Sequence, residues 1–302
     1  MSPFEQARAP VNGGESRSAR PSRQEARTLL KKIVDLPTLP AVVQKVIKVV
    51  EDERSSATDL ARVIMTDESL TARVLRLANS AFYGHHRGVS SVTQAMVVLG
   101  FDVVKSLVLG ISIFNTLWGK GKKVSAERKK MWLHSVTTAS ASNVIISATK
   151  PEKRETAFVA GLLHDIGKVA LLSVYPQEYQ DICRSAGNKR CPIQEVEASV
   201  LGFDHAEVGG WLSEQWNLPP EIVNAIMYHH RPGAAPADSC LLTSVVHVGD
   251  LLATGTEQGD SDWILLVDPT AKATLGVTDA DLLHYAHEPS IRGDHLKDFM
   301  AR

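Results

Sequence analysis

The sequence has little of what secreted and membrane proteins depend on. Its 302 residues include three cysteines, Cys183, Cys191 and Cys240, and no C-x-x-C pair. This odd count is more typical of a reducing compartment than of a disulfide scaffold. No apolar run of about 20 residues is free of charge, and the N-terminus lacks the apolar centre of a signal peptide. We therefore expect a cytoplasmic protein that does not insert into a membrane.

An excess of charge is absent as well. Lysine and arginine total 33 and aspartate and glutamate 34, so the formal net charge is -1 at pH 7. With no overall field to attract nucleic acid, polyanion binding would depend on a local patch. One basic cluster is present, and such a run is more typical of a solvated linker: Lys120, Lys122, Lys123, Arg128, Lys129 and Lys130. The sequence therefore argues against a nucleic-acid partner.

Strand patterns are scarce, and helical patterns take their place. Apolar residues between 39 and 50 recur at i, i+3 and i+4, the spacing of a helix packed on one face. Candidate N-caps recur along the chain: Ser56, Asp67 or Ser69, Asp204 with Glu207, and Thr278 or Asp279. We predict an all-α fold, with second-half helices near 127–149, 152–174, 176–187, 192–201, 205–216, 220–230 and 239–254, and a short last helix.

Composition divides the chain into five parts. Residues 1–23 are rich in Arg, Ser, Pro and Gly and predict a disordered lead. Residues 24–118 predict an N-terminal helical subdomain, which the basic linker 119–127 separates from a second helical subdomain at 128–256. Residues 257–302 remain as a C-terminal extension.

The segment GLLHDIGKVALL, residues 161–172, places His164 and Asp165 inside an apolar run. An unpaired buried carboxylate is costly, so these groups need partners, and a metal ion would use both. Lys168 follows one helical turn later, where its ammonium could meet a phosphate oxygen or pair with Asp165. A plain surface lysine is the alternative.

Further candidate ligands lie on other predicted helices of the same half: His134, His205, His229, His230 and Asp250. Taken singly, each histidine is more often a hydrogen-bonded core residue, and Asp250 has a possible partner in His247, one turn earlier. Taken together, imidazoles and carboxylates on helices that share one core are the ligand mix of a two-metal site.

This arrangement resembles the HD superfamily of metal-dependent phosphohydrolases. Its signature, a His, a His-Asp pair and a distant Asp, falls on His134, His164-Asp165 and Asp250. The branch that includes the HD-GYP enzymes adds a His and a His-His pair, matched here by His205 and His229-His230. The resemblance implies that these residues ligate two divalent metal ions, and a mixed imidazole and carboxylate shell suits iron or manganese.

The first half resembles a narrower family. The segments LPTLP at 36–40, LTARVLRLANSAFYG at 70–84 and VSSVTQAMVVLGFDVVKSLVLG at 89–110 are similar to the N-terminal helical half of HDOD domains. The resemblance covers residues 29–255. It implies a bacterial protein with a multi-helix, HD-domain-like fold and an N-terminal helical subdomain.

The resemblance carries two expectations about function. HDOD proteins are regarded as signalling modules, often with degraded metal ligands, so it implies a regulatory module that acts through a protein partner or a small-molecule effector. The alternative is a metal-dependent phosphohydrolase, in which Asp165 bridges the metals and Lys168 offsets the phosphate charge. After His229-His230 the chain reads RPGAAPADS, without the Gly-Tyr-Pro element of HD-GYP enzymes, which argues against cyclic di-GMP hydrolysis.

Overall fold

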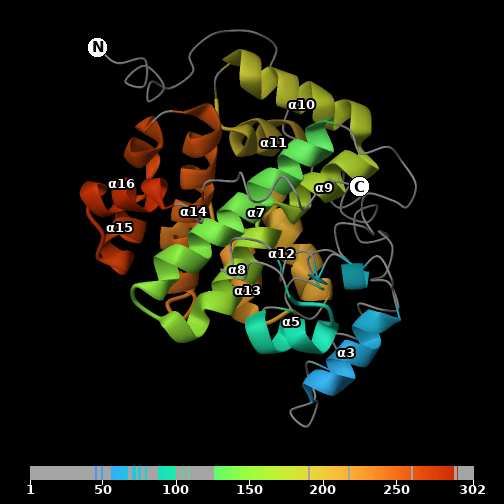
Figure 1. Ribbon diagram of the computed structural model, residues 1–302. Helices are drawn as coiled ribbons and strands as arrows, with labels where there is room; N and C mark the ends of the chain where they lie inside the picture. Colours follow the sequence, from blue (N-terminus) through green and yellow to red (C-terminus); the bar gives the residue numbers. More distant parts are fainter. Residues whose placement is uncertain are drawn as a thin grey trace, which may run out of the picture.

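The computed structural model describes residues 56–66, 88–99, 126–189, 191–216, 218–259 and 261–288, with short stretches between 45 and 108 and residue 291. Every regular element within these residues is a helix, which confirms the all-α prediction (Figure 1). The predictions for the lead 1–23, for most of the linker 119–127 and for the LPTLP segment lie outside the described residues.

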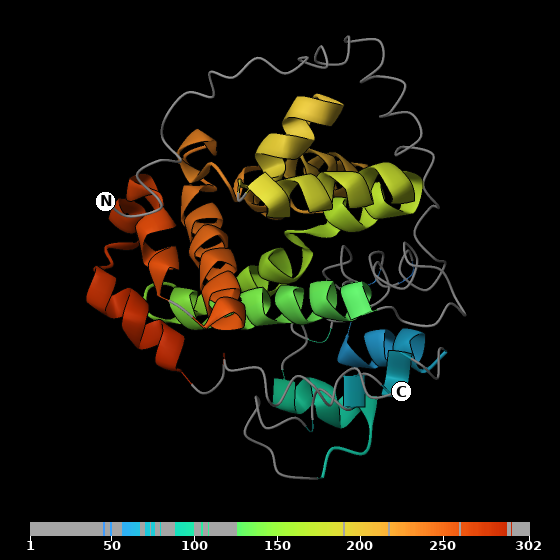
Figure 2. The same cartoon turned by 90° about the horizontal axis from the view of Figure 1, so that it is seen from above.

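Two described helices belong to the first half. α3 (Ala57–Met65) begins at Ser56, whose side chain accepts a hydrogen bond from the Asp59 backbone while the Asp59 carboxylate accepts one from the Ser56 backbone. This capping box confirms the predicted cap. α3 packs against α5 (Val92–Leu99), and both lie at one end of the molecule, away from α10 (Pro176–Lys189) (Figure 2).

The longest helix, α7 (Ala126–Ser147), forms the centre of the second half. α8 (Arg154–Leu163) and α14 (Cys240–Gln258) both pack along it. The buried face of α7 consists largely of small side chains, which allow close approach of both neighbours: Ser135, Thr138, Ala139, Ser140, Ala141 and Ser142. Two of these helices, α7 and α14, carry the candidate ligands His134 and Asp250.

The helix predicted at 152–174 is divided in the structure. A 3-10 turn, η3 (Pro151–Lys153), leads into α8, and α9 (Ile166–Val174) begins after a turn at His164 and Asp165. The apolar pattern runs through this turn without a break, which is why periodicity alone predicted one helix.

The segment Thr156–Val174 is apolar enough to cross a membrane by composition, with a mean hydropathy of 1.6. However, 78% of the window is buried inside the fold, as in core helices of soluble proteins.

Three further helices follow the predicted bounds within one or two residues. They are α11 (Ile193–Leu201), α12 (His205–Gln215) and α13 (Pro220–Tyr228). Gly202 ends α11 with a φ of 83°, a left-handed conformation that glycine adopts without strain. The chain then reverses, and the predicted capping box of Asp204 and Glu207 starts α12.

The helices described between residues 257 and 288 pack on the rest of the fold. α14 continues to Gln258, beyond the predicted end at 254, and the 3-10 turn η5 (Asp262–Leu266) contacts it. α15 (Pro269–Leu275), which the sequence did not predict, also packs against α14. Its seven residues are too few to show a helical period. α16 (Asp279–His287) begins at Thr278, as predicted.

Gly167 brings the backbones of α9 and α12 into contact. A Cβ atom built at Gly167 would lie 1.9 Å from the carbonyl oxygen of His205. Only a glycine fits between the two helices here, and this contact holds the turn with Asp165 next to the first residue of α12.

We predict that Gly167→Ala destabilises the protein by about 3 kcal/mol or more, because the added methyl group would force the two helices apart. Gly187→Ala is the matched control: Gly187 lies in α10, with no atom within 4 Å of an added Cβ. This control should raise stability by about 0.5–1 kcal/mol. Thermal unfolding of both variants checks the pair, and similar midpoints for the two would contradict the close contact.

Candidate metal centre

The structure brings all the predicted ligands together from separate elements. His134 projects from α7, His164 and Asp165 from the turn between α8 and α9, and Asp250 from α14. His205 is the first residue of α12, and His229 and His230 follow directly after α13. Three groups of these side chains each place their ligand atoms within 4.8 Å of one another.

Asp165 lies between two sets of side chains. The first set contains His134 and His164, and the second contains His205 and His229. Its Oδ2 atom is 3.4 Å from Nε2 of His164 and 3.8 Å from Nε2 of His134. Its Oδ1 atom is 3.2 Å from Nε2 of His205 and 3.9 Å from Nε2 of His229. Each carboxylate oxygen therefore faces a different set.

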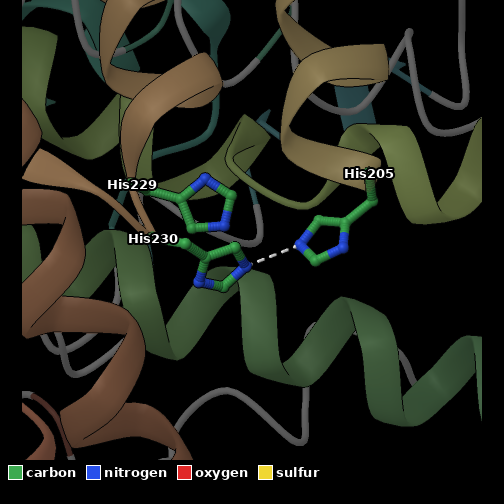
Figure 3. Close-up of side chains that lie close together, drawn as sticks. All are labelled: His205, His229 and His230. Atoms are coloured by element: carbon green, nitrogen blue, oxygen red, sulfur yellow. Dashed lines mark hydrogen bonds between the residues drawn. The ribbon is translucent and has the colours of Figure 1, made fainter. Parts of the chain in front are cut away.

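Asp250 joins the first set. Its Oδ1 atom lies 3.0 Å from Nε2 of His134 and 3.6 Å from Nε2 of His164. The second set consists of His205, His229 and His230, whose rings turn toward one another (Figure 3). In this set the Nε2 atoms of His205 and His230 are 2.9 Å apart.

Backbone contacts orient two of the buried histidines of the cluster. Nδ1 of His164 donates to the carbonyl oxygen of Gly161 at 2.7 Å, and Nδ1 of His229 donates to that of Ile226 at 2.7 Å. The Nδ1 contact turns each Nε2 atom toward the centre, where its lone pair would be the ligand of a bound ion.

Three polar atoms at the centre lack hydrogen-bond partners in the described part of the chain. Nε2 of His164, Nε2 of His229 and Oδ1 of Asp165 are buried and make no hydrogen bond. A buried acceptor without a partner costs about 1–3 kcal/mol, and three such atoms face the same centre. Neighbouring ligands of an ion at about 2.1 Å lie roughly 3 Å apart, close to several of the distances here. The cluster therefore fits a divalent metal ion.

The histidines at the centre differ in the direction in which their pKa is shifted. Burial lowers the pKa of His134, but hydrogen bonds with Asp250 and Glu257 outweigh it and raise the pKa to about 9. Burial lowers the pKa of His229 to about 3, with the charges of His164 and His205 acting in the same direction. The carboxylates favour the protonated, positively charged form of histidines such as His134. A metal ion would supply this positive charge instead, so its binding would release the protons.

Burial raises the pKa of both central carboxyl groups, yet their neighbours outweigh it. For Asp165 the charges of His164 and Lys168 hold the pKa well below its usual range, and for Asp250 the hydrogen bond with His134 and the charge of His164 do the same. Both side chains are therefore anions at neutral pH, as metal ligation requires.

The structure shows the contacts of two residues whose partners the sequence left open. Lys168 pairs with Asp165, its Nζ atom 2.7 Å from Oδ2, and only 21% of its side chain is exposed. His247 makes no hydrogen bond with Asp250: its Nδ1 donates to the carbonyl oxygen of His229, and its Nε2 accepts from the backbone of Asp268.

Sequence reasoning missed two glutamates that contact the Nδ1 atoms of candidate ligands. Nδ1 of His205 lies 2.6 Å from Oε2 of Glu197, and Nδ1 of His134 lies 3.0 Å from Oε1 of Glu257. Glu197 lies on α11 within the sequence VEASVL, where a carboxylate stands in an apolar stretch as Asp250 does. That signal was available, but no motif accompanied it.

Comparison with known proteins places this fold and cluster in a family. The sequence model of the HDOD domain matches residues 36–232, more than half of the chain. The chain belongs to the HDOD family. The match includes the ligand candidates from His134 to His230, while Asp250 lies beyond it and joins them only in the folded structure.

Solved structures share the fold of this HDOD protein. An HDOD domain protein of unknown function from Geobacter sulfurreducens has a TM-score of 0.76 at 24% identity, covering 92% of this chain and 98% of its own. A protein from Shewanella amazonensis named "Putative phosphohydrolase" has a TM-score of 0.72 at 24% identity, covering 90% of this chain and 98% of its own. At these identities the likeness concerns the fold alone.

An uncharacterized protein from Treponema pallidum is 25% identical over 222 residues. The aligned part is 73% of this HDOD chain but only 42% of that relative. The chain thus spans less than half the length of this curated relative.

We predict that the double substitution His164→Ala and Asp165→Ala removes most of the divalent metal that the wild type retains after loading and gel filtration, because it deletes ligand atoms facing both sets. His284→Ala, at an exposed histidine of α16, is the control and should retain the wild-type content. Elemental analysis measures both. A carefully loaded wild type with less than about a tenth of an equivalent would contradict the metal centre.

Proposed function

We propose that this HDOD protein is a signalling module whose second half is held together by a divalent metal centre and which acts through a protein partner or a small-molecule effector. The observation that carries the proposal is the convergence of buried, unpartnered ligand atoms from separate helices. A metal that joins these elements stabilises the folded module, because the unfolded chain cannot gather the same ligands.

The two oxygens of Asp165 support a centre of two ions. His134, His164 and Asp250 would hold one ion with Oδ2, and the histidines of the second set would hold the other with Oδ1. Imidazole and carboxylate ligands in this proportion suit iron or manganese. We therefore expect about two equivalents of metal per chain.

The chain after His230 supports a regulatory role over cyclic dinucleotide hydrolysis. Instead of a Gly-Tyr-Pro element, this segment forms the 3-10 turn η4 (Pro232–Ala234), which packs against α14 and α15. The guanidinium of Arg231 lies 3.6 Å from the Asp204 carboxylate at the start of α12. The contacts of this segment are thus with the protein itself.

A specific observation favours a second function, a metal-dependent phosphohydrolase. The side chains of Lys168, His230 and His134 retain 21%, 16% and 13% exposure, so these residues of the centre contact solvent. Bound divalent ions supply an activated water and a clamp for phosphate. Lys168 can then turn from Asp165 and donate to a phosphate oxygen, since its ammonium offers three donors.

One experiment separates the two functions. We expect the manganese-loaded protein to leave cyclic di-GMP and bis(p-nitrophenyl) phosphate intact. Removing the metal should lower stability: ions at about 100 times their dissociation constant contribute about 2.7 kcal/mol, equal to about 5–10 °C in the midpoint. Phosphate or nitrophenol release and thermal unfolding, each with and without chelator, are the measurements.

Lys168→Ala serves as the decisive variant. It should leave metal content unchanged, because Lys168 is a neighbour of Asp165 and not a candidate ligand. Metal-dependent hydrolysis of either substrate that disappears in Lys168→Ala at unchanged metal content would reject the regulatory function and establish the phosphohydrolase. An unchanged midpoint after chelation would reject the stabilising role of the metal.

A further inference from the structure

Glu197 is a fully buried carboxylate outside the ligand set. It lies on α11, one turn before the helix ends, and its exposure is 0%. Burying a carboxylate without compensation strongly destabilises a fold, so Glu197 requires partners that stabilise its charge. The predicted metal ligands do not include it.

The hydrogen bonds that the structure gives Glu197 all come from donors. The hydroxyl of Tyr179 donates to Oε1 at 2.6 Å, and the backbone amide of His205 donates to Oε2 at 2.8 Å. Nδ1 of His205 lies 2.6 Å from the same Oε2 atom. A carboxylate that only accepts is ionised, and short distances of this kind mark charge-assisted hydrogen bonds.

These contacts fix one tautomer of His205. With a proton held on Nδ1 by Glu197, the ring directs Nε2 to the centre, where Oδ1 of Asp165 lies 3.2 Å away and a bound ion would take the Nε2 lone pair. The amide contact also anchors the backbone of His205 at the first residue of α12. The ring can therefore neither flip nor rotate without breaking the contact with Glu197.

His205 differs in this from the other buried ligand candidates. His164 and His229 donate their Nδ1 protons to neutral backbone carbonyls. Glu257, behind His134, has 25% of its side chain exposed and lies 3.9 Å from Lys130, so solvent and a cation weaken its charge. Glu197 alone among these partners places a full, buried negative charge behind a ligand ring.

We propose that Glu197 is a positioning residue for the metal centre: its carboxylate orients His205 and raises the affinity of the second set for a divalent cation. A carboxylate behind a ligating histidine increases the basicity of the ring and attracts the ion through it. This inference rests on the metal centre of the proposed function. It assigns Tyr179 the further role of holding the carboxylate in place.

Glu197→Gln tests the charge at nearly constant shape, because the amide still offers an oxygen to His205. We expect zinc affinity, measured by competition with a chromophoric chelator, to fall 10- to 100-fold, with the unfolding midpoint of the metal-free protein close to that of the wild type. Glu195→Gln is the matched control on the same helix, at an exposed glutamate, and should bind zinc as the wild type does. Tyr179→Phe keeps the charge and both contacts to His205, so its affinity should fall by less than in Glu197→Gln.

The outcomes separate the possible failures. Equal zinc affinities of wild type and Glu197→Gln overturn the role of Glu197 and leave the metal centre in place. A loss in Tyr179→Phe as large as in Glu197→Gln shows general damage to the core and also overturns it. A wild type that binds no zinc overturns the metal centre itself.

A spectroscopic measurement on the wild type requires no variant. In the zinc-loaded protein, imidazole ¹⁵N NMR should show His205 with a proton on Nδ1 and the metal on Nε2. Metal on Nδ1, or an Nδ1 atom without a proton, overturns the proposal even if Glu197→Gln does not fold.

Discussion

The free-energy cost of burying the Asp165 carboxylate is the constraint on which the second half of this protein depends. The side chain stands in a turn between two apolar helices, where a charge without partners would destabilise the fold. The fold compensates it with Lys168 from the helix that follows the turn and with imidazoles that converge from other elements. The buried charge thus determines which helices must meet, and the small residues at their contacts allow them to do so.

Much of this arrangement follows from local sequence. Helical periodicity and capping residues predict most second-half helices within one or two residues, since Asp204 and Thr278 mark helix starts directly. The ligand candidates stand out as polar residues in apolar helices. The turn at His164 and Asp165 could not be predicted, because it depends on the tertiary contact of Gly167 with α12 and not on the apolar pattern.

The contacts of Glu257 with His134 and of Glu197 with His205 show a second limit of sequence reasoning. Glu257, near the end of α14, is partly exposed and has the sequence signature of an ordinary surface residue. Its contact with His134 joins positions 123 residues apart. Glu197 is only eight residues from His205, yet the contact requires the reversal at Gly202. Such partners follow from how helices pack, which propensity and spacing do not specify.

The distribution of the ligands over separate helices links metal affinity to the conformation of the whole second half. If an ion binds only when α7, α12 and α14 are correctly placed, its binding free energy adds to that of folding. By reciprocity, a partner or effector that displaces one of these helices changes the metal affinity by the same factor as the metal changes its own binding. If the protein acts as the proposed signalling module, such a metal centre would have a use without any turnover, because it would set the conformational equilibrium that a partner recognises.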